Sequence, residues 1–450
     1  MPEVSALPRS TKIVVTLGPA CSEPAVLERM LAAGVDVVRL NFSHGAAADH
    51  VERARLVRAT AARLGVEVAI MADLQGPKIR VGKFAQGKVT LEPGQTFILD
   101  AECELGNEER VGLDYKELPQ DVERGAVLLL DDGLIRLDVE QVDGPRIVTR
   151  VALGGMLSNN KGINRMGGGL TAPALTPKDM DDMKAAAALE ADYLAVSFPK
   201  NKEDMYMARQ LLRAAGGHAL LIAKIERAEA ITYLEEIVDA SDGIMVARGD
   251  LAVEVGTAAV PGLQKRMLKL ARERNKLTIT ATQMMESMIH APVPTRAEVS
   301  DVANAVLDGT DAVMLSAETA AGRYPVETVE TMAQICVEAE KSATVELDRD
   351  FLDRTFTRVD QSIAMATLFT AFHLKVKAIA SLTDSGSTAL WMSRHNGGCP
   401  IYALTPKVAT QRKMALYRNV RPLYLEQTGD RDHVLIAAEE LLVERGQVRP

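Results

Sequence analysis

Two apolar runs of strand length end in charged residues that could bind a metal and an anion. One run ends at Lys224 and Glu226, and the other, Gly243 to Ala247, leads into Asp250. In parallel sheets and barrels, ligands bind beyond the carboxyl ends of the strands, where these three side chains fall. A lysine and two carboxylates suit a hard divalent cation with few protein ligands, which leaves room for a phosphate substrate. The alternative is that all three are solvated loop charges.

The elements that position these residues follow a strand–helix–strand pattern. Residues 228–240, between the two runs, place Ile231, Leu234, Ile237 and Val238 on one face of a helix. Further strand-like runs, each separated from the next by helical patterns, occupy residues 12–17, 35–40, 66–72, 191–198, 277–281 and 312–315. Almost every run ends in polar residues. Eight such runs predict an α/β fold, a (β/α)8 TIM barrel.

Composition indicates a soluble, multidomain protein. The chain has 450 residues, 47% of them hydrophobic and 25% charged, which is too long for one core. A net charge of −9 argues against a nucleic-acid binder. The four cysteines lack metal-ligand spacing and read as reduced thiols of a cytoplasmic protein. We find no signal peptide and no apolar run near the ~20 residues that span a membrane.

The chain divides into four segments. Residues 1–77 and 171–348 form the two parts of the barrel domain, and the second part ends in a helical pattern over 327–346. Residues 78–170 contain short β-type runs and no good helix, which predicts an inserted small β-barrel domain. Its Gly-rich return, residues 166–169, suits a hinge, so the insertion is either a lid over the site or inert. Residues 349–450 predict a C-terminal α/β domain.

Several motifs resemble those of the pyruvate kinase family, in the family's order and along essentially the full chain. They are Arg39–Gly45 (RLNFSHG), Asp73–Arg80 (DLQGPKIR, the bacterial type), Ser158–Asn164 (SNNKGIN), Lys224–Glu226 (KIE), Met245–Leu251 (MVARGDL), Ala281–Met288 (ATQMMESM), Pro294–Glu298 (PTRAE) and Asp301–Gly309 (DVANAVLDG). The resemblance implies phosphoryl transfer from phosphoenolpyruvate to ADP, giving pyruvate and ATP in the last step of glycolysis. An enolate stabilised by Mg2+ (or Mn2+) is then protonated. It also implies an allosteric homotetramer.

The resemblance assigns roles to individual residues. Glu226 and Asp250 match the Mg2+ ligands, and Lys224 matches the lysine that bridges the phosphoryl and enolate oxygens. A simple ion pair between Lys224 and Glu226 is the alternative, since residues i and i+2 of a strand share a face. The remaining matches are the phosphate-binding Arg39, the carboxylate-binding turn at Gly249 and Asp250, the proton-delivering Thr282, and the nucleotide-binding Asn41, His44, Arg80 and Lys161.

A monovalent-cation site is also implied, with one departure. Asn41, Ser43 and Asp73 match side chains that hold K+, but Lys78 stands where K+-dependent members carry Glu. We expect Lys78 to point inward, pair with Asp73 and replace K+, because a second nearby cation would be strongly repelled. Alternatively, Lys78 points to solvent and K+ still binds.

A second ligand site is expected in the C-terminal domain, at Thr383, Ser385, Gly386, Ser387 and Thr388. Hydroxyls around a glycine between a strand and a helix can form a phosphate nest, although a plain helix cap has the same sequence. Compared with the family, the domain ends early, at Pro450, so we expect a sugar monophosphate or AMP rather than a bisphosphate. Ala252, usually Gly in the family, is a minor departure.

Two other functions fit parts of this pattern. A related metal-dependent barrel enzyme could use pyruvate enolate in aldol or lyase chemistry, but it has no need of a β lid, Arg80 or Lys161. A non-catalytic regulatory paralogue should have lost Lys224, Glu226 or Asp250, and all three are present.

Overall fold

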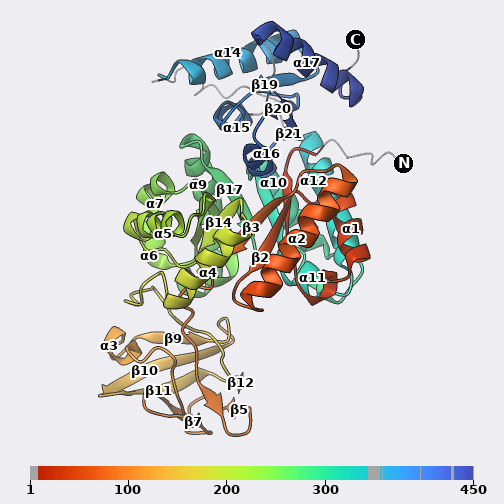
Figure 1. Cartoon of the computed structure of the whole chain (residues 1–450). Helices are drawn as coiled ribbons and strands as arrows, with labels where there is room; N and C mark the ends of the chain where they lie inside the picture. Colours follow the sequence, from red (N-terminus) through yellow and green to blue (C-terminus); the bar gives the residue numbers. More distant parts are fainter. Residues whose placement is uncertain (1–8, 343–354, 357, 396, 427–429, 449–450) are drawn as a thin grey trace.

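A computed structural model describes residues 9–342, 355–356, 358–395, 397–426 and 430–448. An α/β barrel occupies the centre of the molecule, a β domain lies beyond one end, and an α/β domain lies beyond the other (Figure 1). The order along the chain is barrel, β insertion, barrel, C-terminal domain.

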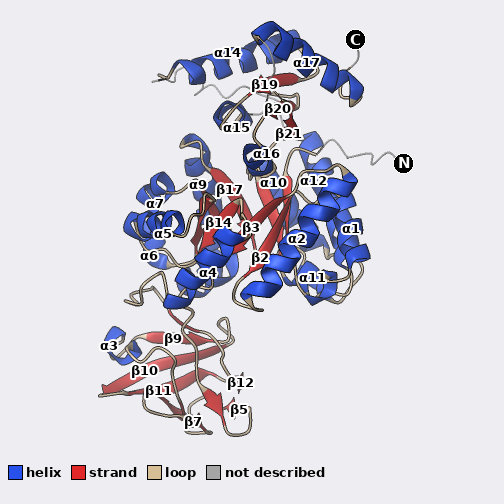
Figure 2. Ribbon diagram, viewed as in Figure 1, coloured by secondary structure: helices blue, strands red, loops and turns tan. Residues whose placement is uncertain are grey.

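In the described residues, eight parallel strands close into the barrel, in the order β1-β18-β17-β16-β15-β14-β3-β2. The strands are β1 (Lys12–Thr16), β2 (Val37–Asn41), β3 (Ala69–Asp73), β14 (Tyr193–Val196), β15 (Leu220–Ile225), β16 (Gly243–Ala247), β17 (Leu277–Ala281) and β18 (Ala312–Leu315). Each coincides with one of the predicted runs, so the predicted TIM barrel is confirmed. Figure 2 shows the strands surrounded by helices.

The surrounding helices bury their apolar faces against the strands. They are α1 (Pro24–Ala32), α2 (Ala47–Leu64), α4 (Pro177–Ala188), α5 (Lys202–Ala214), α6 (Ala228–Thr232), α7 (Leu234–Ala240), α8 (Arg248–Val255), α9 (Val260–Glu273), α10 (Arg296–Leu307), α11 (Ala317–Ala320) and α12 (Pro325–Ser342). Continuous helix over 228–240 was a wrong prediction, because Tyr233 leaves helical geometry and separates α6 from α7. The β-branched and aromatic run of Ile231, Thr232 and Tyr233 has low helix propensity. The helix predicted over 327–346 ends at Ser342, beyond which residues 343–354 lie outside the described part.

The predicted β insertion is present and is described throughout, but it forms one mixed six-stranded sheet and two two-stranded sheets rather than the single closed small barrel that we predicted. Its elements are β4 (Lys83–Phe84), β5 (Lys88–Leu91), β6 (Thr96–Asp100), β7 (Leu105–Gly106), β8 (Arg110–Val111), α3 (Leu118–Asp121), β9 (Val127–Leu130), β10 (Ile135–Asp143), β11 (Arg146–Leu153), β12 (Gly155–Ser158) and β13 (Ile163–Arg165). The insertion has an apolar core of its own, with Phe97 and Leu128 fully buried. It can therefore move as a unit relative to the barrel.

The C-terminal domain packs helices around the three-stranded parallel sheet β19-β20-β21. Its described elements are α14 (Val359–Leu374), β19 (Ile379–Leu382), α15 (Ser387–Ser393), β20 (Ile401–Thr405), α16 (Val408–Met414), β21 (Val420–Tyr424) and α17 (Arg431–Glu444). Its core joins that of the barrel interior, since Met245 and Ile279 of the barrel share one apolar cluster with Met392 and Met414. No helix in the described ranges is both long and apolar enough to cross a membrane.

An aspartate directly precedes every second strand of the barrel. The carboxylates cap backbone N–H groups of the neighbouring strand: Asp36 accepts from Ile13 at 2.8 Å, Asp192 from Ile70 at 2.7 Å, Asp242 from Leu221 at 2.8 Å and Asp311 from Thr278 at 2.9 Å. Each also pairs with an arginine, namely Arg9, Arg58, Arg209 and Arg394 respectively. Among the described residues, the same arrangement of an aspartate with a strand N–H and an arginine therefore occurs four times at the amino-terminal end of the barrel.

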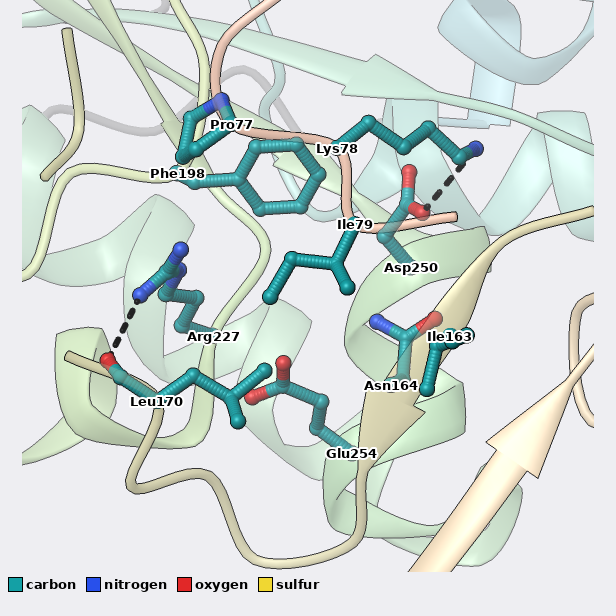
Figure 3. Close-up of a pocket in the computed structure, with 10 residues that line it drawn as sticks. All are labelled: Pro77, Lys78, Ile79, Ile163, Asn164, Leu170, Phe198, Arg227, Asp250 and Glu254. Carbon is teal, nitrogen blue, oxygen red and sulfur yellow. Dashed lines mark hydrogen bonds and ion pairs between the residues drawn. The ribbon is translucent and has the colours of Figure 1, made fainter. Parts of the chain in front are cut away.

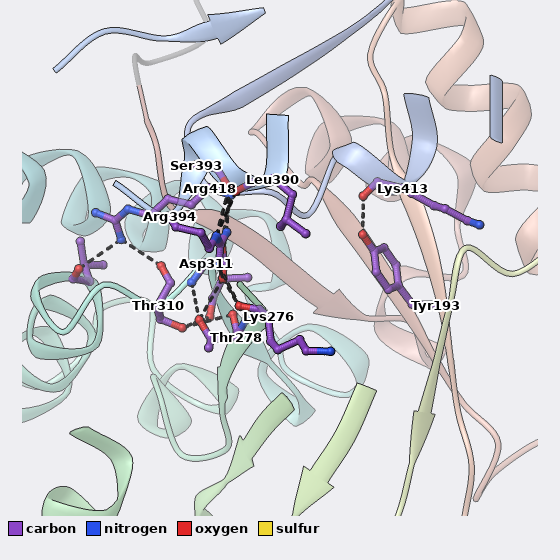
Figure 4. A network of polar contacts seen from close by, with 12 residues as sticks. Tyr193, Lys276, Thr278, Thr310, Asp311, Leu390, Ser393, Arg394, Lys413 and Arg418 are labelled. Carbon is purple, nitrogen blue, oxygen red and sulfur yellow. Dashed lines mark hydrogen bonds and ion pairs between the residues drawn. The ribbon is translucent and has the colours of Figure 1, made fainter. Parts of the chain in front are cut away.

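Only one of these four arginines comes from outside the barrel domain. Arg394, at the end of α15, extends from the C-terminal domain to Asp311, and both side chains are at most 3% exposed (Figure 4). The Arg394 guanidinium also donates to the Lys276 carbonyl at 2.8 Å, and the Arg418 backbone N–H donates to Asp311 at 3.2 Å. The C-terminal domain therefore supplies the last pair of the set and is fixed to the barrel by it.

We predict that Arg394→Met destabilises the protein by about 3–5 kcal/mol, because it leaves Asp311 buried without its counter-ion. Thermal unfolding with parallel activity measurements checks this. Arg209→Met is the matched control: its pair with Asp242 is about one-quarter exposed, so its loss costs about 1 kcal/mol or less. Equal losses of thermal midpoint in the two variants would contradict the role of Arg394.

Candidate active site

Four charged side chains meet at the carboxyl end of the barrel. Lys224 Nζ lies 2.9 Å from Glu226 Oε1 and 3.3 Å from Asp73 Oδ1, and it donates to Ser197 Oγ at 2.7 Å. Arg39 Nε donates to the other oxygen of Asp73 at 2.6 Å. The side chains come from β2, β3 and β15, whose parallel alignment brings together residues far apart in sequence. The ion pair between Lys224 and Glu226 does form, so the two readings of Lys224 are compatible.

Burial governs the ionisation of this cluster. Asp73 and Glu226 expose only 1% of their side chains. Burial raises the pKa of Glu226 to about 7, Lys224 opposes the rise, and Asp250 and Asp73 add to it. Burial likewise disfavours ionised Asp73 and Lys224, but their opposite charges outweigh it: Arg39 and Lys224 lower the pKa of Asp73, while Asp73 and Glu226 raise that of Lys224. Asp73 and Glu226 face Arg39 and Lys224. The third carboxylate, Asp250, faces the distant and part-exposed Lys78 at 3.9 Å, which balances its charge weakly, so Glu226 carries the remaining deficit.

A divalent cation fits this deficit. Glu226 Oε2 already accepts the Phe198 N–H at 2.9 Å, which orients the carboxylate, and the Asp250 side chain is one-quarter exposed. Within the described residues, no group of three or more acidic, histidine or cysteine side chains could hold a metal. Mg2+ is commonly bound by one or two carboxylates, with waters and substrate oxygens completing its shell. Glu226 and Asp250 are thus a pair of carboxylates of the kind that Mg2+ uses, and their role as its ligands stays a prediction.

Helix α8 begins directly at the site. The residue before it, Ala247, offers no side-chain cap to the first N–H groups of the helix. In the turn predicted to bind the substrate carboxylate, the Gly249 N–H donates to Thr282 Oγ1 at 2.8 Å. The Thr282 hydroxyl in turn donates to the Ala281 carbonyl at 2.7 Å. Thr282 is thus joined to the first turn of α8, and a ligand that takes the Gly249 N–H must displace its hydroxyl.

Three non-glycine residues at the ends of two barrel strands have a left-handed backbone. Thr282, Gln283 and Phe198 have φ values of 68°, 53° and 56°. Non-glycine residues seldom adopt this left-handed conformation, and a β-branched residue such as Thr282 does so least readily. Each such residue costs roughly 1–3 kcal/mol, so surrounding contacts must hold it in place.

Residues of the β insertion and the barrel line a common pocket (Figure 3). Ile163 and Asn164 belong to the insertion, Arg227 and Glu254 to the barrel, and Asp250 lies at the rim. The returning chain is bound to the barrel here: the Gly167 N–H donates to the Glu254 carbonyl at 3.0 Å. The predicted hinge therefore lies against α8, the helix that carries Asp250.

The predicted nucleotide residues do not line this pocket, and they make separate contacts in the insertion and in the barrel. Lys161 pairs with Asp131 at 2.7 Å, and Arg80 donates to the Asn160 carbonyl at 3.3 Å, both within the insertion. Asn41 accepts the Ser43 N–H at 3.1 Å, and His44 is exposed beside them.

The predicted pair between Lys78 and Asp73 is wrong. Asp73 is held by Arg39 and Lys224, while Lys78 Nζ lies 3.9 Å from Asp250 Oδ1 (Figure 3). Asp73 is fully buried between two cations, whereas Lys78 is one-third exposed at the rim and meets the more accessible carboxylate. Lys78 nevertheless points toward the site rather than into solvent.

The predicted effector residues lie in the C-terminal domain, at the opposite end of the barrel (Figure 1). The Gly386 N–H donates to Thr383 Oγ1 at 2.9 Å, and the hydroxyls of Ser385 and Ser387 lie 3.0 Å apart. Thr388 is half-buried in the first turn of α15. Lys407 and Thr410 also donate to Asp384 of this loop, at 2.9 Å each, so the loop is held by contacts within the domain.

Sequence reasoning missed two residues at the site. Arg248 is buried and donates to the carbonyls of Ala281 and Thr282. Glu254 is buried and accepts the Ala228 N–H at 2.8 Å. A signal was present for Glu254, a charged residue one turn after Asp250 and so on the same helix face. Arg248 follows an apolar strand directly, as Lys224 does, and could have been found in the same way.

Comparisons with known proteins agree on one family. Family models described as "Pyruvate kinase, barrel domain" and "Pyruvate kinase, alpha/beta domain" match residues 8–329 and 361–450. Pyruvate kinase of Haemophilus influenzae is 52% identical over 444 residues, 97% of this chain and 93% of that protein. Pyruvate kinase II of Salmonella typhimurium is 53% identical, covering 97% and 92%. A crystal structure of a pyruvate kinase from Cryptosporidium parvum has a TM-score of 0.92 at 33% identity, covering 98% and 92%.

We predict that Glu254 makes stability pH-dependent. Burial raises its pKa to about 7 in the folded protein, above the ordinary value of 4.5. The protonated form is thus favoured by folding, and stability falls by up to about 3 kcal/mol as pH rises from about 4.5 to about 7. In thermal melts, the stability of Glu254→Gln relative to that of wild type should therefore increase between pH ~5 and ~8. For the control Glu28→Gln, at an exposed position, the plot of thermal midpoint against pH should be parallel to that of wild type. A parallel plot for Glu254→Gln would contradict the prediction.

Proposed function

Because the chain belongs to the pyruvate kinase family, which converts phosphoenolpyruvate and ADP to pyruvate and ATP, we propose that Lys224, Arg39 and Thr282 are its catalytic residues. The observation that supports this most directly is the position of Lys224 Nζ, between the buried carboxylates of Asp73 and Glu226. An ammonium held there is preorganised to meet negative charge that develops on a substrate. Members of the family use a divalent metal.

Arg39 and Lys224 supply fixed positive charge to the phosphoryl group. The Arg39 guanidinium is held by Asp73 and by Thr16 Oγ1, at 3.0 Å from its Nη1. With its orientation fixed, the planar fork can bind two phosphoryl oxygens. Lys224 lies on the neighbouring side and neutralises charge shared between the phosphoryl and enolate oxygens. Phosphoryl transfer depends on such positioning and electrostatics.

Glu226 and Asp250 would hold Mg2+ (or Mn2+), which supplies positive charge to the substrate oxygens when bound. A cation there also favours ionised Glu226 and so removes the charge deficit of the cluster. Gly249 and Asp250, in the first turn of α8, offer N–H groups to the substrate carboxylate. When that carboxylate takes the Gly249 N–H, the Thr282 hydroxyl is released to deliver a proton to the methylene carbon of the enolate.

Closure of the β insertion completes the nucleotide site. Arg80 and Lys161 lie on the insertion, and Asn41 and His44 lie on the barrel across the opening. Closing brings the Lys161 ammonium onto ADP and excludes water, which strengthens the electrostatic contacts inside. We further propose that the protein acts as a homotetramer. We also propose that it is cytoplasmic, because its four cysteines are free, as in proteins of a reducing compartment.

We predict that Lys224→Met lowers kcat on the order of 10²- to 10⁴-fold while binding of phosphoenolpyruvate is mostly kept, because Lys224 acts chiefly on the transition state. Turnover of phosphoenolpyruvate and ADP, coupled to lactate dehydrogenase, measures it. Lys202→Met removes a surface lysine paired with Glu236 and should leave kcat unchanged. Near wild-type kcat in Lys224→Met would exclude the proposed role.

We propose that the enzyme does without K+. Part of the oxygen set expected to hold K+ is engaged within the chain: Asp73 pairs with Arg39 and Lys224, although its Oδ1 accepts no hydrogen bond from the described residues, and Asn41 Oδ1 accepts the Ser43 N–H at 3.1 Å. Lys78 adds a further positive charge at the rim. Activity should therefore be equal in K+ and tetramethylammonium at fixed ionic strength, whereas Lys78→Glu should be weak and partly rescued by K+. A wild-type enzyme that loses most of its rate without K+ would show a working K+ site.

We also propose that the loop from Thr383 to Thr388 binds a phosphorylated effector, a sugar monophosphate or AMP. The loop connects a strand to the start of α15 and carries four hydroxyls around Gly386. Glucose 6-phosphate, ribose 5-phosphate or AMP should lower the phosphoenolpyruvate concentration at half-saturation, and Ser387→Ala should weaken the response. If none of the three shifts the curve, the loop is a helix cap and no more.

A further inference from the structure

The buried guanidinium of Arg248 binds the loop that carries Thr282. Arg248 is the first residue of α8 and is 8% exposed. Its Nε donates to the Ala281 carbonyl at 3.2 Å and its Nη2 to the Thr282 carbonyl at 2.6 Å, while Nη2 also contacts the sulfur of Met284. Its Nη1 pairs with Asp301 of α10 at 2.7 Å. Three of these four contacts are to residues 281–284, the end of β17 and the start of the loop that follows it.

That loop has a backbone which Thr282 would not adopt by itself. Thr282 and Gln283 are both left-handed, and the two carbonyls bound by Arg248 are those on either side of Thr282. Fixing both carbonyls fixes the orientation of the two peptide planes and so the direction of the Thr282 Cα–Cβ bond. A planar fork with several donors can do this, whereas a lysine ammonium offers one point of attachment.

Both hydrogen-bond partners of the Thr282 hydroxyl are groups next to Arg248. The hydroxyl donates to the Ala281 carbonyl, which Arg248 Nε shares, and it accepts from the N–H of Gly249, the residue that follows Arg248. Arg248 therefore sets the position of the hydroxyl from both sides. In contrast, its bond to Asp301 leads away from the site to a side chain that is 37% exposed.

We propose that Arg248 is a positioning residue for the proton-transfer step, which holds Thr282 so that its hydroxyl faces the methylene carbon of the enolate. This rests on the proposed role of Thr282. In the forward direction the hydroxyl donates its proton to that carbon as the C–H bond forms, and it regains a proton from water. In reverse it removes a methyl proton from pyruvate. Arg248 itself touches neither substrate nor reacting atoms.

The test uses three single variants, Arg248→Lys, Asp301→Asn and Thr282→Val. It also uses the double variant that combines Arg248→Lys with Thr282→Val. Two rates are measured with Mg2+ present: kcat for phosphoenolpyruvate and ADP, and exchange of pyruvate methyl protons with deuterium from solvent in the presence of ATP. Arg394→Met serves as a control for the loss of a buried arginine, because Arg394 lies at the other end of the barrel. Thermal midpoints of all variants are recorded.

We expect Arg248→Lys to slow methyl-proton exchange and kcat together, by about tenfold to a hundredfold, with the KM for phosphoenolpyruvate little changed. Asp301→Asn and Arg394→Met should keep both rates at temperatures where they are folded. In the Thr282→Val background, Arg248→Lys should have no further effect, because both residues act on one step.

Wild-type exchange in Arg248→Lys, or an equal loss with and without the Thr282 hydroxyl, would overturn the proposal while leaving the role of Thr282 intact. If Thr282→Val alone leaves both rates unchanged, the proposed role of Thr282 fails, and the positioning role of Arg248 fails with it.

Discussion

Closure of the barrel removes two carboxylates, Asp73 and Glu226, from water at its carboxyl end, and the rest of the site depends on how their charge is balanced. Burial of an ionised carboxylate is strongly unfavourable unless it is paired. Arg39 and Lys224 pair with them, but Asp250 adds a third negative charge, which the part-exposed Lys78 at 3.9 Å balances only weakly, so the cluster lacks positive charge. On the proposed function, this deficit would attract a divalent cation, and Arg39 and Lys224 would face the phosphoryl group. Metal binding and the positioning of the substrate would then both follow from one imbalance.

The two ends of the barrel use similar groups for opposite purposes. At the amino-terminal end, Asp36, Asp192, Asp242 and Asp311 each hold a strand N–H and an arginine, so their charge is balanced within the described chain. At the carboxyl end the charge is left unbalanced and the backbone at Thr282 is strained. The balanced ion pairs at the amino-terminal end, including the one with Arg394 of the C-terminal domain, stabilise the barrel. Their contribution offsets the strain and the unbalanced charge at the carboxyl end.

Much of this could be predicted from the sequence because it depends on local patterns. The eight strands were recognisable since each apolar run ends in polar residues, and Lys224, Glu226 and Asp250 followed from their places at strand ends. The partner of Lys78 was not predictable, because a long flexible side chain in the insertion chooses among carboxylates that other strands deliver. The break between α6 and α7 at Tyr233 was not predictable either, because the apolar helical pattern of the sequence continues across it although the helix is interrupted. The place of Arg248 after an apolar strand was visible in the sequence, but its role was not, because its contacts are two backbone carbonyls, which carry no mark in the sequence.

The most direct test of the charge imbalance is a titration of Mn2+ into the substrate-free protein, followed by the signal of the free ion. Wild type and Asp301→Asn should bind one Mn2+ with equal affinity, whereas Glu226→Gln should bind it about tenfold or more weakly, because the substitution removes the unbalanced charge. Asp250→Asn should weaken binding in the same way. If Glu226→Gln binds Mn2+ as tightly as wild type, the buried carboxylate is not what draws the cation, and the site must be held by other groups.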